Sequence, residues 1–170
     1  MKNFILWTCV LFCCGCGGRN ENLKPITGFD SSRYLGNRHE VARLENSFEK
    51  GLEKVTAAYS MNGNGEILVI NTGFDSESKK WKTATGHAKF AKTPDIGELK
   101  VSFFRPFYGA YVILEIDRQN YNYALVSGGN LKYLWILSRT PALDSATTEL
   151  LLKKARSFGF NTDKLIFSKQ

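Results

Sequence analysis

Short segments in which apolar and polar residues alternate recur along most of the chain. Alternation with a period of two is the pattern of β-strands that bury one face. Residues that favour turns separate the segments, such as NGNG at 62–65 and GGN at 128–130. The predicted strands span residues 38–45, 53–61, 65–72, 80–90, 97–104, 109–117, 121–128 and 131–138. This series predicts a mainly β protein, either an antiparallel sandwich or a barrel.

After the eighth predicted strand the period changes to that of an amphipathic helix. Asp144 or Ser145 can cap its start, and Gly159 can end it. Its apolar stripe consists of Ala146, Leu150, Leu151, Ala155 and Phe158. An eight-stranded barrel has no room inside for a helix, so we expect the stripe to pack on the outside. A short last strand is predicted at 164–167, and residues 28–170 are expected to form one domain.

The first residues have the features of an export signal. The apolar run at 4–14 is too short for a membrane span, which needs ~20 residues, but it suits a signal peptide at residues 1–15. The sequence CCGC at 13–16 resembles a bacterial lipobox, which implies that Cys16 is acylated and anchors the protein in the membrane. Residues 16–27 would then be a lipidated tether. Ordinary secretion without lipidation is the alternative.

The residues that follow the signal limit both location and chemistry. Gly17 follows Cys16 in place of the aspartate that retains lipoproteins in the inner membrane, which favours an outer-membrane address. All four cysteines lie within the first 16 residues, so the domain has no disulfide and no thiol chemistry. The formal charge is +7, but the basic residues are scattered, which favours a solvated surface over a nucleic-acid groove.

Several blocks, in order along the chain, together resemble one known family. The blocks are YLGNRHEVARL at 34–44, SFEKGL at 47–52, VSFFRPFYG at 101–109, YNYALV at 121–126 and YLWILSRTP at 133–141. They resemble the lipocalins, specifically the bacterial outer-membrane lipoprotein lipocalins related to apolipoprotein D. The resemblance implies an eight-stranded antiparallel up-and-down β-barrel with one C-terminal helix outside it. It also implies an apolar cavity and an anchored location, with the periplasmic face of the outer membrane expected.

The family geometry and strand alternation together indicate which side chains point into the barrel. In lipocalins an arginine on the last barrel strand packs at the closed end, and Arg139 matches it. An inward Arg139 places alternate residues of its strand inside, and the same parity argument applies to the second strand. Ala42 is expected inside as well, where its small side chain leaves volume. The predicted ligand-binding residues are Trp135, Tyr133, Leu137, Val55, Ala57, Tyr59, Phe103 and Tyr111. The alternative is that they form a packed core without a cavity.

One position departs from the family pattern. The signature tryptophan of the lipocalins lies two residues after a glycine that matches Gly36, and Arg38 takes its place here. Two guanidinium groups, Arg38 and Arg139, are therefore expected to meet at the closed end. Glu40 shares the face of Arg38 by alternation and is expected to bridge the two. The alternative is that the Arg38 side chain extends to the end of the barrel and keeps its charge in water.

Few of the remaining residues suggest a catalytic, metal-binding or partner-binding role. His39 and His87 lie in separate predicted strands, so neither a metal site nor a cofactor is expected. No catalytic set emerges, and an enzyme is not expected. The aromatic run at 103–108 indicates a membrane-facing patch, a homodimer contact or a segment folded back over the sheet. Phe48 is expected near the open end, either as a lid contact or as a cap of its own loop.

The sequence therefore predicts a lipid-anchored envelope protein that binds and carries or stores a fatty acid or a lysophospholipid. Two alternatives stay open at this point. One is a structural envelope protein whose barrel is filled by its own side chains. The other is an enzyme that acts on a lipid bound in the cavity.

Overall fold

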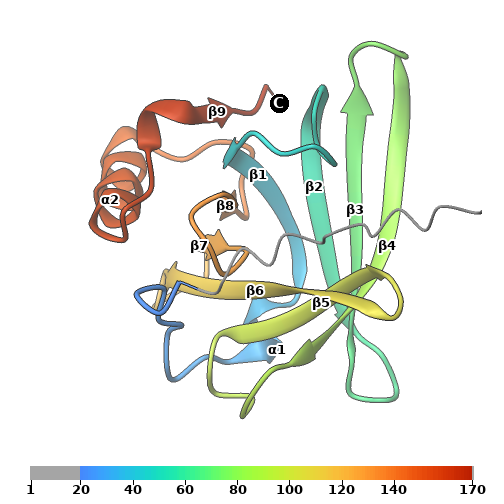
Figure 1. Ribbon diagram of the computed structural model, residues 1–170, viewed down its shortest axis with the longest axis vertical. Helices are drawn as coiled ribbons and strands as arrows, with labels where there is room; N and C mark the ends of the chain where they lie inside the picture. The colour runs from blue at the N-terminus through green and yellow to red at the C-terminus, as the bar shows by residue number, and fades with distance from the viewer. Residues whose placement is uncertain (1–19, 170) are drawn as a thin grey trace, which may run out of the picture.

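The strands of the computed structural model, which describes residues 20–169, form a closed antiparallel barrel with a helix outside it (Figure 1). The strands are β1 (Gly36–Leu44), β2 (Leu52–Met61), β3 (Ile67–Asp75), β4 (Lys80–Phe90), β5 (Glu98–Phe104), β6 (Phe107–Ile116), β7 (Tyr123–Ser127), β8 (Leu134–Ser138) and β9 (Leu165–Phe167). The helices are α1 (Ser31–Tyr34), α2 (Ser145–Ser157) and the 3₁₀ helix η1 (Thr162–Lys164). The predicted fold is confirmed. The predicted signal peptide and Cys16 lie outside the described residues.

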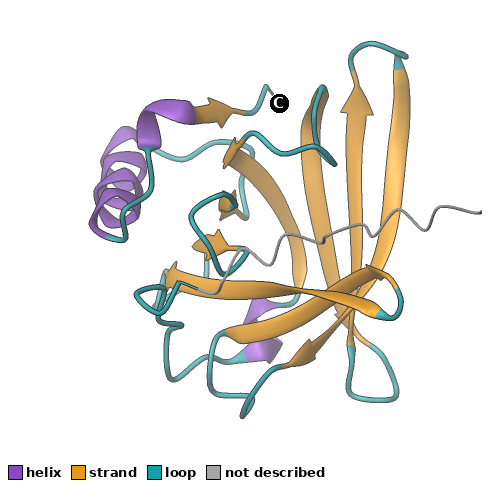
Figure 2. Ribbon diagram, in the orientation of Figure 1, coloured by secondary structure: helices purple, strands orange, loops and turns teal. Residues whose placement is uncertain are grey.

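Strand β1 closes the barrel because it pairs along both of its edges (Figure 2). Each strand from β2 to β8 pairs with the next, and β8 pairs with β1. On its other edge, β1 pairs with β2 through residues 36–39 and with β9 through residues 42–44. The short last strand, β9, therefore lies outside the barrel. It pairs with the part of β1 that extends beyond the pairing of β1 with β2.

The two ends of the barrel differ. Helix α1 and the residues before it cover one end, where Ile26, Phe29 and Tyr34 join the interior apolar cluster. Figure 1 shows α1 at this end and the β1–β2 loop, residues 45–51, at the opposite end. We call these the closed end and the mouth. Because β1 runs from the closed end to the mouth, its residues lie along the whole depth of the barrel.

A bulge in β1 reverses the facing of its second half. The register between β1 and β8 shifts between Glu40 and Ala42, so one extra residue is accommodated there. Val41 and Ala42 both join the outer apolar cluster, and Arg43 turns back to contact Glu40. The prediction that Ala42 faces the interior is therefore wrong. The extra residue reverses the side of the sheet to which the following side chains point.

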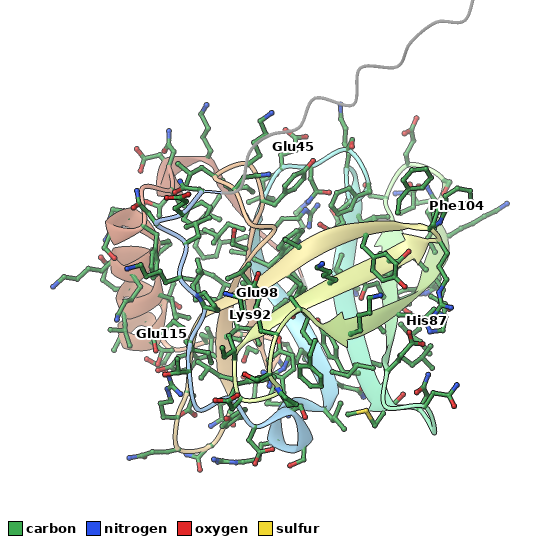
Figure 3. All side chains as sticks on the ribbon, turned by 60° about the horizontal axis from the view of Figure 1, so that its bottom comes forward. Glu45, His87, Lys92, Glu98, Phe104 and Glu115 are labelled. Carbon is green, nitrogen blue, oxygen red and sulfur yellow. The ribbon has the colours of Figure 1, made fainter. Side chains whose placement is uncertain are left out.

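Helix α2 covers the outer cluster as predicted, but the predicted stripe is wrong at Ala146 and Leu150, which are exposed. The Asp144 side chain accepts a hydrogen bond from the Thr147 main-chain N–H at 2.8 Å and caps the helix start. Leu151 and Ala155 are fully buried against the outside of the sheet. Figure 3 shows Glu115 on the side of the barrel that faces the helix, where its carboxylate lies 2.9 Å from Lys154 Nζ. None of the helices within residues 20–169 is long and apolar enough to cross a membrane.

Candidate functional site

The interior holds a cavity of about 760 Å³ with a mainly apolar lining. Its walls come from the seven strands β1 to β6 and β8, and Phe48 and Glu49 of the β1–β2 loop reach its mouth. The predicted ligand-binding residues that line it are Trp135, Leu137, Val55, Ala57, Tyr59, Phe103 and Tyr111. Their contact with a ligand stays a prediction, but strand alternation placed them on the correct side of the sheet.

Tyr133 lies elsewhere. Strand β8 begins only at Leu134, because residues 131 and 132 form a turn, and alternation does not extend back to Tyr133. Its ring stacks on Trp135, with centroids 6.1 Å apart, and on Phe48, with centroids 5.8 Å apart. It lines a surface groove beside the barrel and not the cavity. The three rings form an aromatic stack at the mouth, with Phe48 61% exposed.

A buried polar cluster lies beneath this stack. The Arg43 guanidinium pairs with Glu40 and also donates to the main-chain oxygens of Glu49 and Leu52, at 2.9 and 3.1 Å. The Glu49 carboxylate accepts from Trp135 Nε1 at 2.9 Å and from Asn46 Nδ2 at 2.6 Å. Sequence reasoning missed Arg43, Asn46 and Glu49. Only the bulge in β1 turns Arg43 inward, and no residue pattern signals that bulge.

The pKa of the Glu40 carboxyl is raised above its ordinary value of 4.5, chiefly by burial and then by the negative charge of Glu49. A raised pKa in the folded state means that the folded protein binds more protons than the unfolded chain above pH 4.5. We therefore expect the free energy of unfolding to fall with rising pH in wild type, relative to Glu40→Gln. Urea titrations of both proteins from pH 4.5 to 8 measure this, and parallel curves would contradict it.

Arg38 lies at the closed end, as predicted, and its side chain is fully buried. Its guanidinium stacks over the Tyr34 ring, 4.0 Å from the centroid, and donates to the main-chain oxygens of Tyr121 at 3.1 Å and Tyr34 at 3.4 Å. Arg139 shares the Tyr34 oxygen at 3.3 Å, so the two cations do meet. Arg139 also donates to the main-chain oxygens of Arg33, Leu35 and Asn37.

Glu40 does not bridge the two arginines, which corrects its predicted place at the closed end. Its carboxylate is held by Arg43 and accepts from Ser168 Oγ at 2.6 Å, further toward the mouth. The pKa of Arg139 is lowered by burial first and by the positive charge of Arg38 second. The closed end therefore carries two like charges that are satisfied mainly by carbonyl oxygens.

Arg38→Trp is expected to raise the free energy of unfolding by about 1–4 kcal/mol, because replacing a desolvated charge with a well-packed apolar group is commonly stabilising. The lipocalins, which the sequence resembles, have tryptophan at the matching position. Thermal denaturation of the ligand-free proteins measures the change. An unchanged or lower midpoint would show that the carbonyl bonds and the stacking on Tyr34 outweigh the burial of the charge.

Three tyrosines bring their hydroxyls together between the cavity and the closed end. The Tyr111 hydroxyl lies 2.6 Å from that of Tyr34 and 2.9 Å from that of Tyr59. Burial raises the pKa of all three, so each hydroxyl is neutral and keeps its proton at ordinary pH. Tyr34 comes from α1, Tyr59 from β2 and Tyr111 from β6. Tyr34 was not predicted as a site residue because no strand pattern covers it.

The family model described as lipocalin-like domain matches residues 29–170. The chain belongs to the lipocalin family. It is 45% identical over 170 residues to the outer membrane lipoprotein Blc of Vibrio cholerae, covering 100% of this chain and 99% of the relative. It is 32% identical over 150 residues to apolipoprotein D of Mus musculus, covering 84% and 77%. The predicted family is confirmed, and the predicted outer-membrane address agrees with the name of the bacterial relative.

The structural comparison supports the fold alone. Insecticyanin of the tobacco hornworm Manduca sexta superposes with a TM-score of 0.70 at 21% identity, covering 87% of this lipocalin and 84% of insecticyanin. At this identity the shared architecture carries no information about the ligand. The ligand of this lipocalin has to be argued from the chemistry of its own cavity.

The predicted aromatic run at 103–108 divides between the cavity and the surface. Phe103 and Phe107 line the cavity, and Phe104 and Phe107 are 75% and 71% exposed, with their ring centroids 6.3 Å apart. Figure 3 shows Phe104 at the outer end of the β5–β6 hairpin. Phe104 and Phe107 therefore do not fold back over the sheet. Phe107 contributes to the lining of the cavity, whereas Phe104 does not.

Proposed function

We propose that this lipocalin binds one elongated apolar molecule in its barrel, either a fatty acid or a lysophospholipid, and carries or stores it in the cell envelope. The observation that supports the proposal is the volume of the cavity. Its volume of about 760 Å³ lies within the range of ~300–1,000 Å³ that is typical of small-molecule sites. Burial of the alkyl chain supplies the free energy, at ~25 cal/mol per Å². A barrel filled by its own side chains is disfavoured by the same volume.

The proposed location is the outer membrane, with the domain on the periplasmic face. Acylated Cys16 would anchor the protein, and residues 16–27 would tether it. The name of the Vibrio cholerae relative supports this location. Acyl chains contribute ~0.8 kcal/mol per buried CH₂, so more than one chain gives stable attachment. The anchor would keep the binding cavity close to a source of lipid.

The proposed mechanism is reversible binding without a covalent change, so the protein acts as a carrier and not as an enzyme. An enzyme acting on a cavity-bound lipid would release shortened products, which mass spectrometry of the bound lipid would reveal. A homodimer through the exposed rings of Phe104 and Phe107 stays a prediction, and sedimentation velocity of wild type and a Phe104→Ser, Phe107→Ser variant would test it.

Native mass spectrometry of the fragment 17–170 tests the proposed function. This fragment contains every described strand and both apolar clusters, so it carries the whole barrel. After incubation with a membrane-lipid extract, we expect one acyl species per protein molecule, with a mass that matches an intact fatty acid or lysophospholipid. Repeated recovery of protein that retains no lipid would contradict the proposal.

A further inference from the structure

Exposed apolar side chains gather at the mouth of the barrel. Because neighbouring strands are antiparallel, four connections meet there, namely residues 45–51, 76–79, 105–106 and 128–133. On or beside them lie the exposed side chains of Phe48, Trp81, Phe103, Phe104, Phe107 and Leu131, which we call the rim. Among residues 20–169 the closed end exposes only one large apolar side chain, that of Met61. Single exposed apolar residues are ordinary, but a group of them at one end indicates a contact surface.

The rim lies around the opening of the cavity. The Ser76 main-chain N–H donates to the Gly51 oxygen at 3.2 Å, so the β3–β4 hairpin stands beside the β1–β2 loop (Figure 1). Phe48 of that loop stacks on Tyr133 of the β7–β8 connection, with ring centroids 5.8 Å apart. Phe107 of the β5–β6 hairpin lines the same cavity as Phe48. A partner that covers the rim would therefore also cover the entrance to the barrel.

Exposed lysines accompany the rim. They lie on the same connections or next to them, and they are Lys50, Lys79, Lys80 and Lys132. None of the four forms an ion pair with any residue of 20–169. The exposed acids on these connections are Glu45 and Glu77. Aromatic rings suit the interfacial layer of a bilayer, and basic side chains beside them suit anionic head groups.

The first described residues also lie at the mouth. The Asn20 main-chain N–H donates to the oxygen of Gly129, in the β7–β8 connection, at 3.0 Å. Cys16, the proposed anchor, precedes Asn20 by four residues, which span at most about 14 Å at ~3.6 Å per residue. Strand β1 has nine residues and is about 30 Å long at ~3.4 Å per residue. The proposed anchor therefore holds the mouth close to the membrane, and the closed end lies beyond its reach.

We propose that the rim docks on a lipid bilayer with anionic head groups, so that a ligand passes between the bilayer and the barrel without crossing water. The exposed rings enter the interfacial layer, and the four lysines contact the head groups. This inference rests on the proposed function, because it takes the mouth as the entrance for the ligand. It gives a role to Trp81 and Phe104, which do not line the cavity.

Sedimentation with sucrose-loaded vesicles measures the docking without the anchor. The fragment 17–170 lacks Cys16, so only the barrel can hold it on a vesicle. We expect it to bind vesicles of phosphatidylethanolamine and phosphatidylglycerol at least tenfold more tightly than vesicles of phosphatidylcholine, because each lysine contributes about fivefold. A fragment that stays in the supernatant, or that binds both kinds of vesicle equally, would overturn the inference.

Two double variants test the rim itself. Trp81→Ser with Phe104→Ser removes two rings, and Lys79→Gln with Lys80→Gln removes two charges. Each is expected to weaken binding to the anionic vesicles more than tenfold. Should the rings instead contact a second copy of the chain, sedimentation velocity would show a dimer of wild type and a monomer of the ring variant, without vesicle binding by either. That result would overturn the inference.

A variant on helix α2, Leu150→Ser with Lys153→Gln, makes both kinds of change away from the rim and is the matched control. It should bind the anionic vesicles as wild type does. None of the changed side chains lines the cavity, so every variant should bind palmitate like wild type in the absence of vesicles, which also shows that it is folded. Wild type that binds palmitate but no vesicle would overturn only this inference. Wild type that binds vesicles but no lipid in its cavity would contradict only the proposed function.

The orientation is measured with an exposed tryptophan at either end of the barrel. The full chain, purified with its acyl anchor, is reconstituted in vesicles that contain a brominated phospholipid, which quenches tryptophan in the interfacial layer. Wild type has Trp81 at the rim, a variant with Trp81→Phe and Met61→Trp has its exposed indole at the closed end, and Trp135 is common to both. We expect stronger quenching of wild type. Equal or stronger quenching of the variant would overturn the inference.

Discussion

Arg43→Met is expected to lower the free energy of unfolding by about 3–5 kcal/mol, the usual cost of removing one partner from a buried charge cluster. Arg43 is 3% exposed, and its guanidinium faces the carboxylate of Glu40. The variant leaves Glu40 and Glu49 close together in the interior without that cation. It also removes the donor to the main-chain oxygens of Glu49 and Leu52, which holds the β1–β2 loop over the mouth. Urea denaturation at pH 7 measures the loss.

Lys154→Met provides the matched control for this prediction. It removes the partner of Glu115 in an ion pair on the surface, and exposed pairs contribute at most about 1 kcal/mol. Adding Glu40→Gln to Arg43→Met should restore part of the lost stability, because the buried cluster then carries one charge fewer. A loss for Arg43→Met as small as that for Lys154→Met would show that the buried cluster is unimportant for folding.

Strand alternation sufficed for most of the fold because a barrel buries one face of every strand. The register of β2 shows this, since alternate residues Val55, Ala57 and Tyr59 line the cavity. Helix α2 was predictable from its cap and from the residues of its stripe that pack on the sheet, Leu151, Ala155 and Phe158, whereas Ala146 and Leu150 are exposed. These features depend on local sequence and on a single periodicity, so they can be recognised without any knowledge of tertiary contacts.

The missed features arise where the backbone departs from that periodicity. The bulge in β1 moves Ala42 outside and brings Arg43 to Glu40, and it depends on pairing with β8, which is far away in the sequence. Tyr133 was misplaced because a turn precedes β8. Tyr34 was missed because it comes from the one-turn helix α1. In each case the position follows from a tertiary contact that no local pattern reports.

The arginine at position 38 has a cost in stability. A buried cation held mainly by carbonyl oxygens contributes less to folding stability than a well-packed apolar side chain would at the closed end. Tryptophan there should stabilise the ligand-free protein.

Ala57→Phe is expected to weaken palmitate binding roughly thirtyfold or more, because its ring would occupy the cavity and an overpacked site costs about 2 kcal/mol. Ala57 lines the cavity on β2 and is 8% exposed. Ala142→Phe makes the same change at an exposed position outside the barrel and should leave binding unchanged. Thermal denaturation of both variants shows whether each is folded.

The palmitate dissociation constant of folded Ala57→Phe, measured by isothermal titration calorimetry beside wild type and Ala142→Phe, tests most directly whether the barrel interior is the binding site. We predict one palmitate per molecule of wild type and of Ala142→Phe, with equal affinity, and a loss of roughly thirtyfold or more for Ala57→Phe. Equal affinity in all three proteins would place the ligand outside the barrel and contradict the account.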